Sequence, residues 1–277
     1  MSECNHNCAS CAEKCDQAPQ TEKTHALSNI KRVIAVVSGK GGVGKSAVTG
    51  MLTVAMKNKG YKCAILDADI TGASIPKMFG VKGEVTGDGT GIYAAKSASG
   101  IRLMSSNLLL ENETDPVVWR GPIIAGMVKQ FWTDVIWGDV DYMFVDCPPG
   151  TGDVPLTVFQ SIKVDGIIVV TTPQELVSMI VEKAVNMANL MHVPVLGLVE
   201  NMSYVLCPDC GKKLDLFGSG KTAEIAKKYR LPLLASIPYD ASIVKASDSG
   251  KLDDLKVDYA DAAADIIESG LPVAERK

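Results

Sequence analysis

A glycine-rich loop between a predicted strand and a predicted helix constrains this chain more than any other feature. Residues 33–46 read VIAVVSGKGGVGKS. The first five of these residues are mostly β-branched and predict a buried strand, whereas Ala47–Lys59 shows the apolar spacing of a helix. The pattern G-x-x-x-x-G-K-S lies between them, with its fixed positions at Gly39, Gly44, Lys45 and Ser46. Strand, loop and helix therefore stand in the order that a phosphate-binding loop requires.

The residue types of this loop suit a magnesium–nucleotide complex. Glycines let consecutive backbone N–H groups turn toward phosphate oxygens, and the helix N-terminus adds partial positive charge. Lys45 is expected to reach the terminal phosphates, and the Ser46 hydroxyl to ligate Mg²⁺. A glycine-rich turn that serves only tight packing is the alternative. The predicted nucleotide-binding residues of the loop are Gly39, Lys40, Gly41, Gly42, Val43, Gly44, Lys45 and Ser46.

A second lysine, Lys40, directly follows the first glycine of the loop. The resulting string GKGGVGKS resembles the deviant Walker A loop of the MinD, ParA and nitrogenase iron-protein superfamily. In that superfamily the extra lysine crosses a dimer interface to the partner's nucleotide. The resemblance therefore implies a homodimer that sandwiches ATP, and a catalytic role for Lys40 beside Lys45. A solvated loop lysine is the alternative.

Two other predicted strands end in carboxylates. The strand Cys63–Leu66 leads into Asp67 and Asp69, and the run Tyr142–Asp146 has the form of a Walker B strand. The carboxyl ends of parallel strands form the ligand-facing edge of such a sheet. We expect Asp69 to orient the attacking water, Asp67 to support the magnesium shell, and Asp146 to hold Mg²⁺ through water. Aspartates that merely form turns or helix caps are the alternative.

Strand and helix patterns alternate along the rest of the chain. Further strands are predicted at 101–105, 166–171, 195–201 and 234–237, and helices within 119–136, 174–190, 222–229 and 259–268. This alternation predicts an α/β fold with a mainly parallel sheet and helices on both faces. The glycine-rich residues 81–100 predict an exposed hairpin or loop. Asn201, Pro238 and Asp240 follow predicted strands and are placed to read adenine.

Composition narrows the class of protein further. The chain has 277 residues, of which 47% are hydrophobic, so it can bury the core of an α/β domain. The net charge is −4 and there is no basic tract, which argues against nucleic acid as a partner. No apolar run is long enough to span a membrane or to form the core of a signal peptide. We therefore expect a cytoplasmic protein that has no membrane partner and whose thiols stay reduced.

The N-terminal residues 1–28 differ from the rest of the chain. They are polar and contain no aromatic residue, so a flexible tail is expected, followed by a P-loop ATPase domain over 29–277. Four thiols within twelve residues suit a zinc ion or an iron–sulfur cluster, both of which accept four thiolates. Redox-labile free thiols are the alternative. The tail cysteines are Cys4, Cys8, Cys11 and Cys15.

A second group of cysteines lies in residues 199–211, which read VENMSYVLCPDCG. Together with the loop GKGGVGKS and the string DCPPGTGD, this segment closely resembles the Mrp (ApbC-like) ATP-binding iron–sulfur carrier proteins, over about residues 29–270. The resemblance implies slow ATP hydrolysis, a homodimer, and a labile [4Fe-4S] cluster that passes between assembly scaffolds and apo iron–sulfur proteins. The functional residues that it implies are Lys40, Lys45, Ser46, Asp69, Asp146, Cys207 and Cys210.

The C-x2-C pair predicts how a cluster would be held. Cys207 and Cys210 supply two thiolates, whereas a [4Fe-4S] cluster needs four ligands. Cys63 and Cys147 lie in or beside strands near the nucleotide site and are poorly placed to complete the set. A cluster on the two-fold axis of a homodimer, with one pair from each chain, is therefore expected. A zinc site that borrows tail cysteines is the alternative.

Two other functions remain open at this point. An ATP-gated electron donor similar to the nitrogenase iron protein would also bridge a cluster, although that relative uses two widely separated cysteines. A positioning ATPase of the ParA or MinD type would need a basic surface, whereas the C-terminal stretch DYADAAADIIE is acidic. Departures from the Mrp pattern at Thr71, Ala73 and Ile180 leave the switching detail open.

Overall fold

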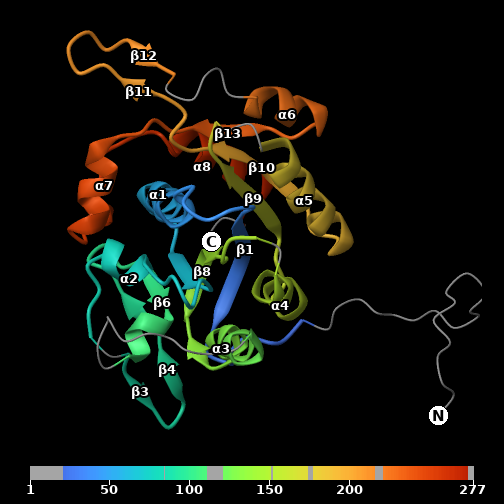
Figure 1. The fold of residues 1–277 in the computed structure, drawn as a ribbon. Coiled ribbons are helices and arrows are strands. Elements are labelled where there is room, and N and C mark those ends of the chain that lie inside the picture. Colours follow the sequence, from blue (N-terminus) through green and yellow to red (C-terminus); the bar gives the residue numbers. More distant parts are fainter. Residues whose placement is uncertain are drawn as a thin grey trace, which may run out of the picture.

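The computed structural model describes residues 21–83, 85–110, 121–150, 152–173, 177–215 and 221–273. Its central sheet has eight strands: β1 (Asn29–Ser38), β2 (Cys63–Asp67), β5 (Ala95–Lys96), β6 (Arg102–Met104), β8 (Asp139–Asp146), β9 (Gly166–Thr171), β10 (Val195–Glu200) and β13 (Leu233–Ser236). The spatial order is β13-β10-β9-β1-β8-β2-β6-β5, and every neighbouring pair is parallel except β5–β6. The predicted mainly parallel sheet is confirmed (Figure 1).

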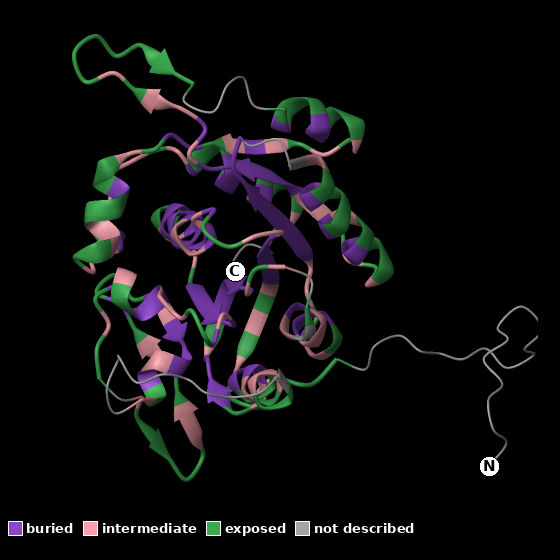
Figure 2. Cartoon of the chain, viewed as in Figure 1, coloured by how far each residue is buried: buried purple, intermediate pink, exposed green. Residues whose placement is uncertain are grey.

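Helices cover both faces of this sheet (Figure 1). They are α1 (Lys45–Asn58), α2 (Ile75–Met78), α3 (Gly121–Thr133), α4 (Asp153–Ser161), α5 (Val177–Leu190), α6 (Thr222–Lys228), α7 (Ala241–Asp248) and α8 (Asp261–Gly270). Strand β1 shows the division, because alternate side chains of a strand face opposite sides. Ala35 and Val37 join the core under α3–α6, whereas Ile34 and Val36 join the core under α1, α2, α7 and α8. Figure 2 shows the central strands largely buried, apart from the first four residues of β1.

Two small sheets and two 3₁₀ turns complete the described fold. Strands β3 (Gly87–Asp88) and β4 (Gly91–Tyr93) form a hairpin, and β4 pairs with β7 (Val135–Ile136). A second hairpin, β11 (Val205–Leu206) and β12 (Lys213–Leu214), projects from the body of the domain (Figure 1). The 3₁₀ turns are η1 (Ser106–Leu109) and η2 (Leu252–Asp254). The hairpin predicted within 81–100 is therefore present.

Sequence patterns missed or misplaced several elements. Helices α4 and α7 were not predicted, because each is short and directly follows a proline-containing loop. The helical stretch predicted to run through Ile136 ends at Thr133, and Val135–Ile136 instead pairs with β4. Among the residues that are described, no helix is long and apolar enough to cross a membrane.

Residues 21–28 pack against the domain, although the sequence pattern places them in the tail. The Glu22 backbone N–H donates to Ser161 O (2.8 Å), and the Trp132 indole donates to Glu22 O (2.9 Å). The Ser28 hydroxyl accepts from the Trp137 N–H (2.8 Å). This segment is thus fixed beside α3 and α4. The cysteines of the predicted tail, Cys4, Cys8, Cys11 and Cys15, lie outside the described residues.

Candidate nucleotide site and thiol pair

The predicted phosphate loop joins the carboxyl end of β1 to the start of α1. Gly42 and Gly44 have φ values of 78° and 74°, in the left-handed region that favours glycine. A Cβ atom at Gly44 would lie 2.3 Å from the Asn201 amide nitrogen, so no larger residue fits there. The loop borders a cavity of about 240 Å³ that is lined by residues 40–47, Ser38, Asp69, Ser74, Met78 and Pro149. The glycines therefore leave an open cradle at the start of α1, an arrangement that can bind phosphate.

Lys45 lies among the carboxylates that end β2 and β8. Its ammonium nitrogen is 2.7 Å from Asp146 Oδ1 and 3.9 Å from Asp69 Oδ2. The side chain is only 6% exposed. Burial by itself lowers the pKa of Lys45, but the two carboxylates outweigh this effect and hold the pKa above its usual value. Lys45 is therefore a fixed positive charge at the mouth of the cradle.

The predicted magnesium ligands lie side by side. The Ser46 hydroxyl donates to Asp146 Oδ2 (2.5 Å), which brings together a hydroxyl and a carboxylate, the oxygen donors that Mg²⁺ prefers. The sequence analysis missed a third residue, Thr49, whose hydroxyl donates to Asp146 Oδ1 (2.8 Å). Thr49 follows Ser46 by one helical turn and so lies on the same face of α1. That spacing was the signal that could have identified it.

Asp67 and Asp69 lie at different depths. Asp67 is fully buried and accepts bonds from the Ser105 hydroxyl (3.0 Å) and the Asp69 backbone N–H (3.2 Å). Burial, and then the nearby Asp146 carboxylate, raise the pKa of Asp67 to about 7. Asp69 is partly exposed and lines the cavity, and burial raises its pKa as well. Of the two, Asp69 is the one placed to meet a ligand or water.

The three residues predicted to read adenine have different surroundings. The Asn201 amide donates to Val43 O in the phosphate loop (2.9 Å), so this residue does lie at the site. Both carboxylate oxygens of Asp240 have partners, because one accepts from the Ser242 N–H (2.7 Å) as the cap of α7 and the other from the Tyr259 hydroxyl (3.0 Å). Pro238 is buried beyond β13. Adenine recognition by these residues stays a prediction.

The residues that depart from the Mrp pattern also lie near the loop. Ile180, on α5, is buried and packs so closely over Gly39 that a Cβ there would lie 2.3 Å from its Cγ2 atom. The backbone carbonyl of Ala73 accepts from the Asn107 amide (2.9 Å). The stretch after β2 and the start of α5 therefore frame the cradle from two sides.

Cys207 and Cys210 lie in the turn of the projecting β11–β12 hairpin. The Cys207 N–H donates to Lys212 O (2.9 Å), and the Gly211 N–H donates to Cys207 O (2.9 Å). Backbone N–H groups of Cys210 and Asp209 donate to Cys207 Sγ and lower the pKa of this thiol. Cys210 is exposed and Cys207 is half-buried. The turn thus presents two accessible thiols, one of them stabilised as the thiolate that metals bind.

The other two described cysteines belong to the core, as predicted. Cys63 and Cys147 are buried, and burial raises the pKa of each thiol to about 12. Within the described part of the chain, no three His, Cys, Asp or Glu side chains are grouped so that they could hold a metal ion. Among the cysteines of the described domain, the hairpin pair is therefore the one that is accessible to a metal.

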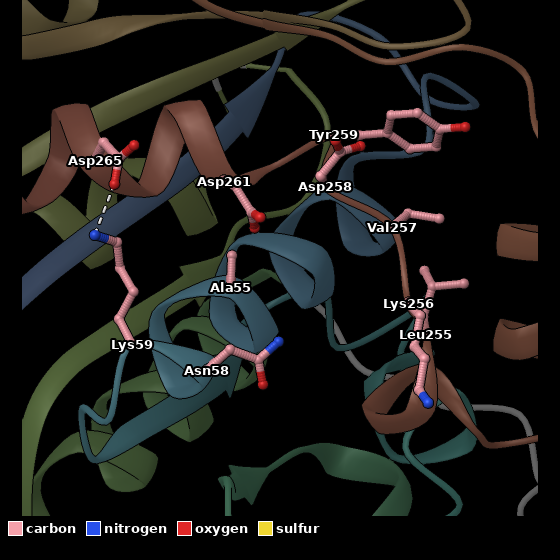
Figure 3. Close-up of a pocket in the computed structure, with 10 residues that line it drawn as sticks. All are labelled: Ala55, Asn58, Lys59, Leu255, Lys256, Val257, Asp258, Tyr259, Asp261 and Asp265. Carbon is pink, nitrogen blue, oxygen red and sulfur yellow. Dashed lines mark ion pairs between the residues drawn. The ribbon is translucent and has the colours of Figure 1, made fainter.

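A larger cavity, of about 750 Å³, lies elsewhere on the domain (Figure 3). It is bounded by the C-terminal part of α1, by residues 255–259 and by the start of α8, and the Lys59–Asp265 ion pair (2.7 Å) crosses one side of it. The phosphate loop is at the opposite end of α1, a helix roughly 20 Å long. The larger cavity has no glycine cradle, so the smaller one is the candidate nucleotide site.

The parallel sheet, the glycine cradle after its first strand and the aspartate on the adjacent strand define a P-loop nucleotide-binding protein. The family model described as ParA: NUBPL iron-transfer P-loop NTPase matches residues 29–269. The chain belongs to this family.

Similar proteins agree with this membership. The chain is 43% identical over 268 residues to an iron-sulfur cluster carrier protein of Clostridium perfringens, covering 90% of this chain and 94% of the relative. It is also 43% identical over 261 residues to the protein of that name from Methanocaldococcus jannaschii, covering 90% of each.

Solved structures show the same fold. A nucleotide-binding protein from Archaeoglobus fulgidus, in complex with ADP and with cobalt found by PIXE, has a TM-score of 0.76 and 45% identity, covering 83% of this chain and 90% of that chain. The MinD protein of Pyrococcus horikoshii has a TM-score of 0.56 at 21% identity, covering 87% of this chain and 96% of that chain, a likeness of fold alone.

Proposed function

We propose that this protein binds and hydrolyses ATP with Mg²⁺ and carries a labile [4Fe-4S] cluster, which it passes to apo iron–sulfur proteins. One observation carries the proposal: the same edge of one sheet bears a complete phosphate cradle and, just beyond β10, an exposed thiol pair prepared for metal. The names of the relatives support the same role.

Each residue of the cradle has a part in the proposed ATPase reaction. Lys45 holds the terminal phosphates, and Ser46 and Asp146 would hold Mg²⁺, which neutralises developing phosphate charge. Asp69 lines the cavity and orients the attacking water. Lys40 also lines the cavity, and we propose that it reaches the nucleotide of a partner chain. Asn201, Pro238 and Asp240 form the proposed adenine side.

The hairpin accounts for the proposed cargo site. Two thiols in each chain supply half of the ligands of a [4Fe-4S] cluster, so a cluster shared across a homodimer fits the count. Cys207 and Cys210 are accessible, which suits a cluster that must be given away. We propose a separate metal centre for the N-terminal cysteines, in a tail that precedes the ATPase domain.

The test uses the full chain with Cys4, Cys8, Cys11 and Cys15 changed to serine, purified anaerobically. We expect about four irons and four sulfides per dimer, as a [4Fe-4S] cluster requires. Cys207→Ala and Cys210→Ala should each abolish this iron, whereas the control Cys63→Ala, in the core, should retain it. Incubation with the apo form of a [4Fe-4S] enzyme should restore that enzyme's activity.

Three results would overturn the proposal. They are iron that survives Cys207→Ala, a loaded protein that is monomeric, and a cluster that delivers electrons to acceptors but never leaves the protein. The last result would favour an electron donor of the nitrogenase iron-protein type.

A further inference from the structure

A four-residue segment, Asn201–Tyr204, joins the phosphate loop to the thiol hairpin, and we name it the strap. It begins where β10 ends and stops where β11 starts, two residues before Cys207. Its first residue is tied to the sheet and to the loop: the Asn201 backbone N–H donates to Thr171 O (2.8 Å) and its amide donates to Val43 O (2.9 Å). The strap is therefore in direct contact with the nucleotide site.

The hydrogen bond from the Asn201 side-chain amide to Val43 O fixes the orientation of one peptide group in the cradle. A peptide unit is planar and trans, so its N–H points away from its C=O. Because the Val43 carbonyl points toward the Asn201 amide, the Gly44 N–H of the same peptide must point away from Asn201, and Gly44 itself lines the cavity. Asn201 thus fixes the direction of the Gly44 N–H, a group that would donate to a bound phosphate. The Asn201 side chain itself contacts the loop backbone.

The other end of the strap is tied to the segment that follows β13, and its last residue also contacts the hairpin. Both the backbone N–H and the hydroxyl of Ser203 donate to Ile237 O (2.9 and 3.0 Å), and the Tyr239 N–H donates to Tyr204 O (2.8 Å). The ammonium of Lys213, on β12, lies 4.3 Å from the centre of the Tyr204 ring. A displacement of Tyr204 would therefore be passed to β11, which follows it directly in the chain, and to β12 through the Lys213 contact.

Met202, in the middle of the strap, has a backbone conformation that side chains seldom adopt. Its φ is 54°, in the left-handed region, which costs a residue other than glycine roughly 1–2 kcal/mol. Such a conformation persists only where the surroundings impose it. Here hydrogen bonds of Asn201 and Ser203 hold the backbone on either side of Met202, and loss of the Asn201–Val43 bond would remove one of these restraints.

We propose that Asn201 is a positioning residue that couples occupancy of the phosphate loop to the geometry of the Cys207–Cys210 pair through the strap. The identity of the two ligands rests on the proposed function. This role is separate from the proposed adenine reading and is added to it, because the contact is with the loop backbone. It therefore predicts coupling to phosphate groups that carry no base.

The experiment measures Co²⁺ binding by thiolate-to-metal absorbance in the full chain with the four tail cysteines changed to serine. Dissociation constants are compared with no ligand, with Mg–ADP and with Mg–tripolyphosphate. Both phosphate ligands should change the Co²⁺ constant by about 5-fold or more, the usual lower range for coupled sites. In Asn201→Asp, which keeps the shape but lacks the amide donor, the change should fall below about 2-fold for both ligands.

Controls separate coupling from folding. Asn29→Ala removes a hydrogen bond from a side-chain amide to Asp139 at the opposite edge of the sheet. This variant should keep the parent's full change of the Co²⁺ dissociation constant with phosphate ligands. Tyr204→Ala loosens the hairpin end of the strap and should abolish the change, and it serves as the second variant if Asn201→Asp does not fold. Co²⁺ affinity without phosphate ligand should stay within about 3-fold in Asn201→Asp, since coupling and intrinsic binding are separate terms.

Three outcomes would overturn the inference. The first is a parent whose Co²⁺ constant does not change with phosphate ligands. The second is that Asn201→Asp and Tyr204→Ala both keep the parent's change. The third is that Asn201→Asp loses only the response to ADP, as expected of a residue that does nothing but read adenine. The iron and cluster-transfer measurements of the parent test the proposed function separately, and they can succeed while this inference fails.

Discussion

The nucleotide site and the thiol hairpin are built in opposite ways. The nucleotide site is assembled from the ends of β1, β2 and β8, all within the core of the central sheet, and its Asp67, Asp146 and Lys45 are buried. The hairpin consists of two strands of two residues each, and its turn is exposed. The core therefore fixes the first site, whereas the second depends on a few local hydrogen bonds.

This contrast has an energetic side. Three carboxylates share the buried site with Lys45, an arrangement that burial alone would disfavour and that the surrounding packing enforces. Metal ligands in the hairpin face no such cost, because they are accessible to water. The core site should thus respond strongly to changes of charge, whereas the hairpin should respond to changes of backbone conformation.

The largest expected effect is that of Lys45→Ala. The substitution removes the cation that faces both the phosphates and Asp146, so ATP affinity should fall at least about 100-fold, or about 2.7 kcal/mol. Titration calorimetry measures this loss. Lys59→Ala, at the other end of α1, is the control and should bind ATP as the parent does. If Co²⁺ binding at the hairpin without nucleotide falls equally in Lys45→Ala, the two regions are not independent.

Asp69→Ala should separate hydrolysis from binding. A group that orients water acts mainly in the transition state, so ATP turnover should fall about 100-fold while ATP affinity stays within about 3-fold. Phosphate release and calorimetry give the two numbers, and Asp69→Asn tests the role of the charge. Equal losses of ATP affinity in Asp69→Ala and Lys45→Ala would contradict the assigned roles.

Asp67→Asn should stabilise the protein in a pH-dependent way. The folded carboxyl has a pKa of about 7 and the ordinary value is 3.8, so the folded state binds the extra proton between these values. Stability therefore falls as the pH rises from 3.8 to about 7 and stays low above that. At pH 8 the variant should gain on the order of 2 kcal/mol, a gain that disappears in acid. Parallel denaturation curves for parent and variant at all pH values would contradict the raised pKa.

The smallest effect is expected for Gly211→Ala, which tests how far metal binding depends on the backbone conformation of the hairpin. Gly211 has a φ of 68°, so a side chain adds roughly 1–2 kcal/mol of backbone strain. We expect Co²⁺ affinity to fall about 10-fold while the melting temperature and ATP affinity hardly change. Gly60, after α1, has a φ of 93° with open space around it, so Gly60→Ala should lower the melting temperature and spare Co²⁺. An equal fall in melting temperature for both variants would show that the hairpin belongs to the cooperative core.

The sequence by itself determined whatever depends on neighbours along the chain. The phosphate loop from Gly39 to Ser46, the strands ending in Asp67 and Asp146, and the C-x2-C turn could be predicted because their steric and hydrogen-bonding requirements are met within a few residues. The mainly parallel direction of the strands could be predicted from the alternation of strands and helices.

Only the tertiary structure decided which distant residues meet these local elements. Ser105 reaches Asp67 because packing brings β6 and β2 together, and no short pattern encodes that contact. The Asn201 bond to Val43 spans 158 positions of the chain, and residues 21–28 dock beside α3 and α4. Such contacts depend on how helices and strands stack against one core, which is settled by burial across the whole domain and not by any stretch of sequence alone.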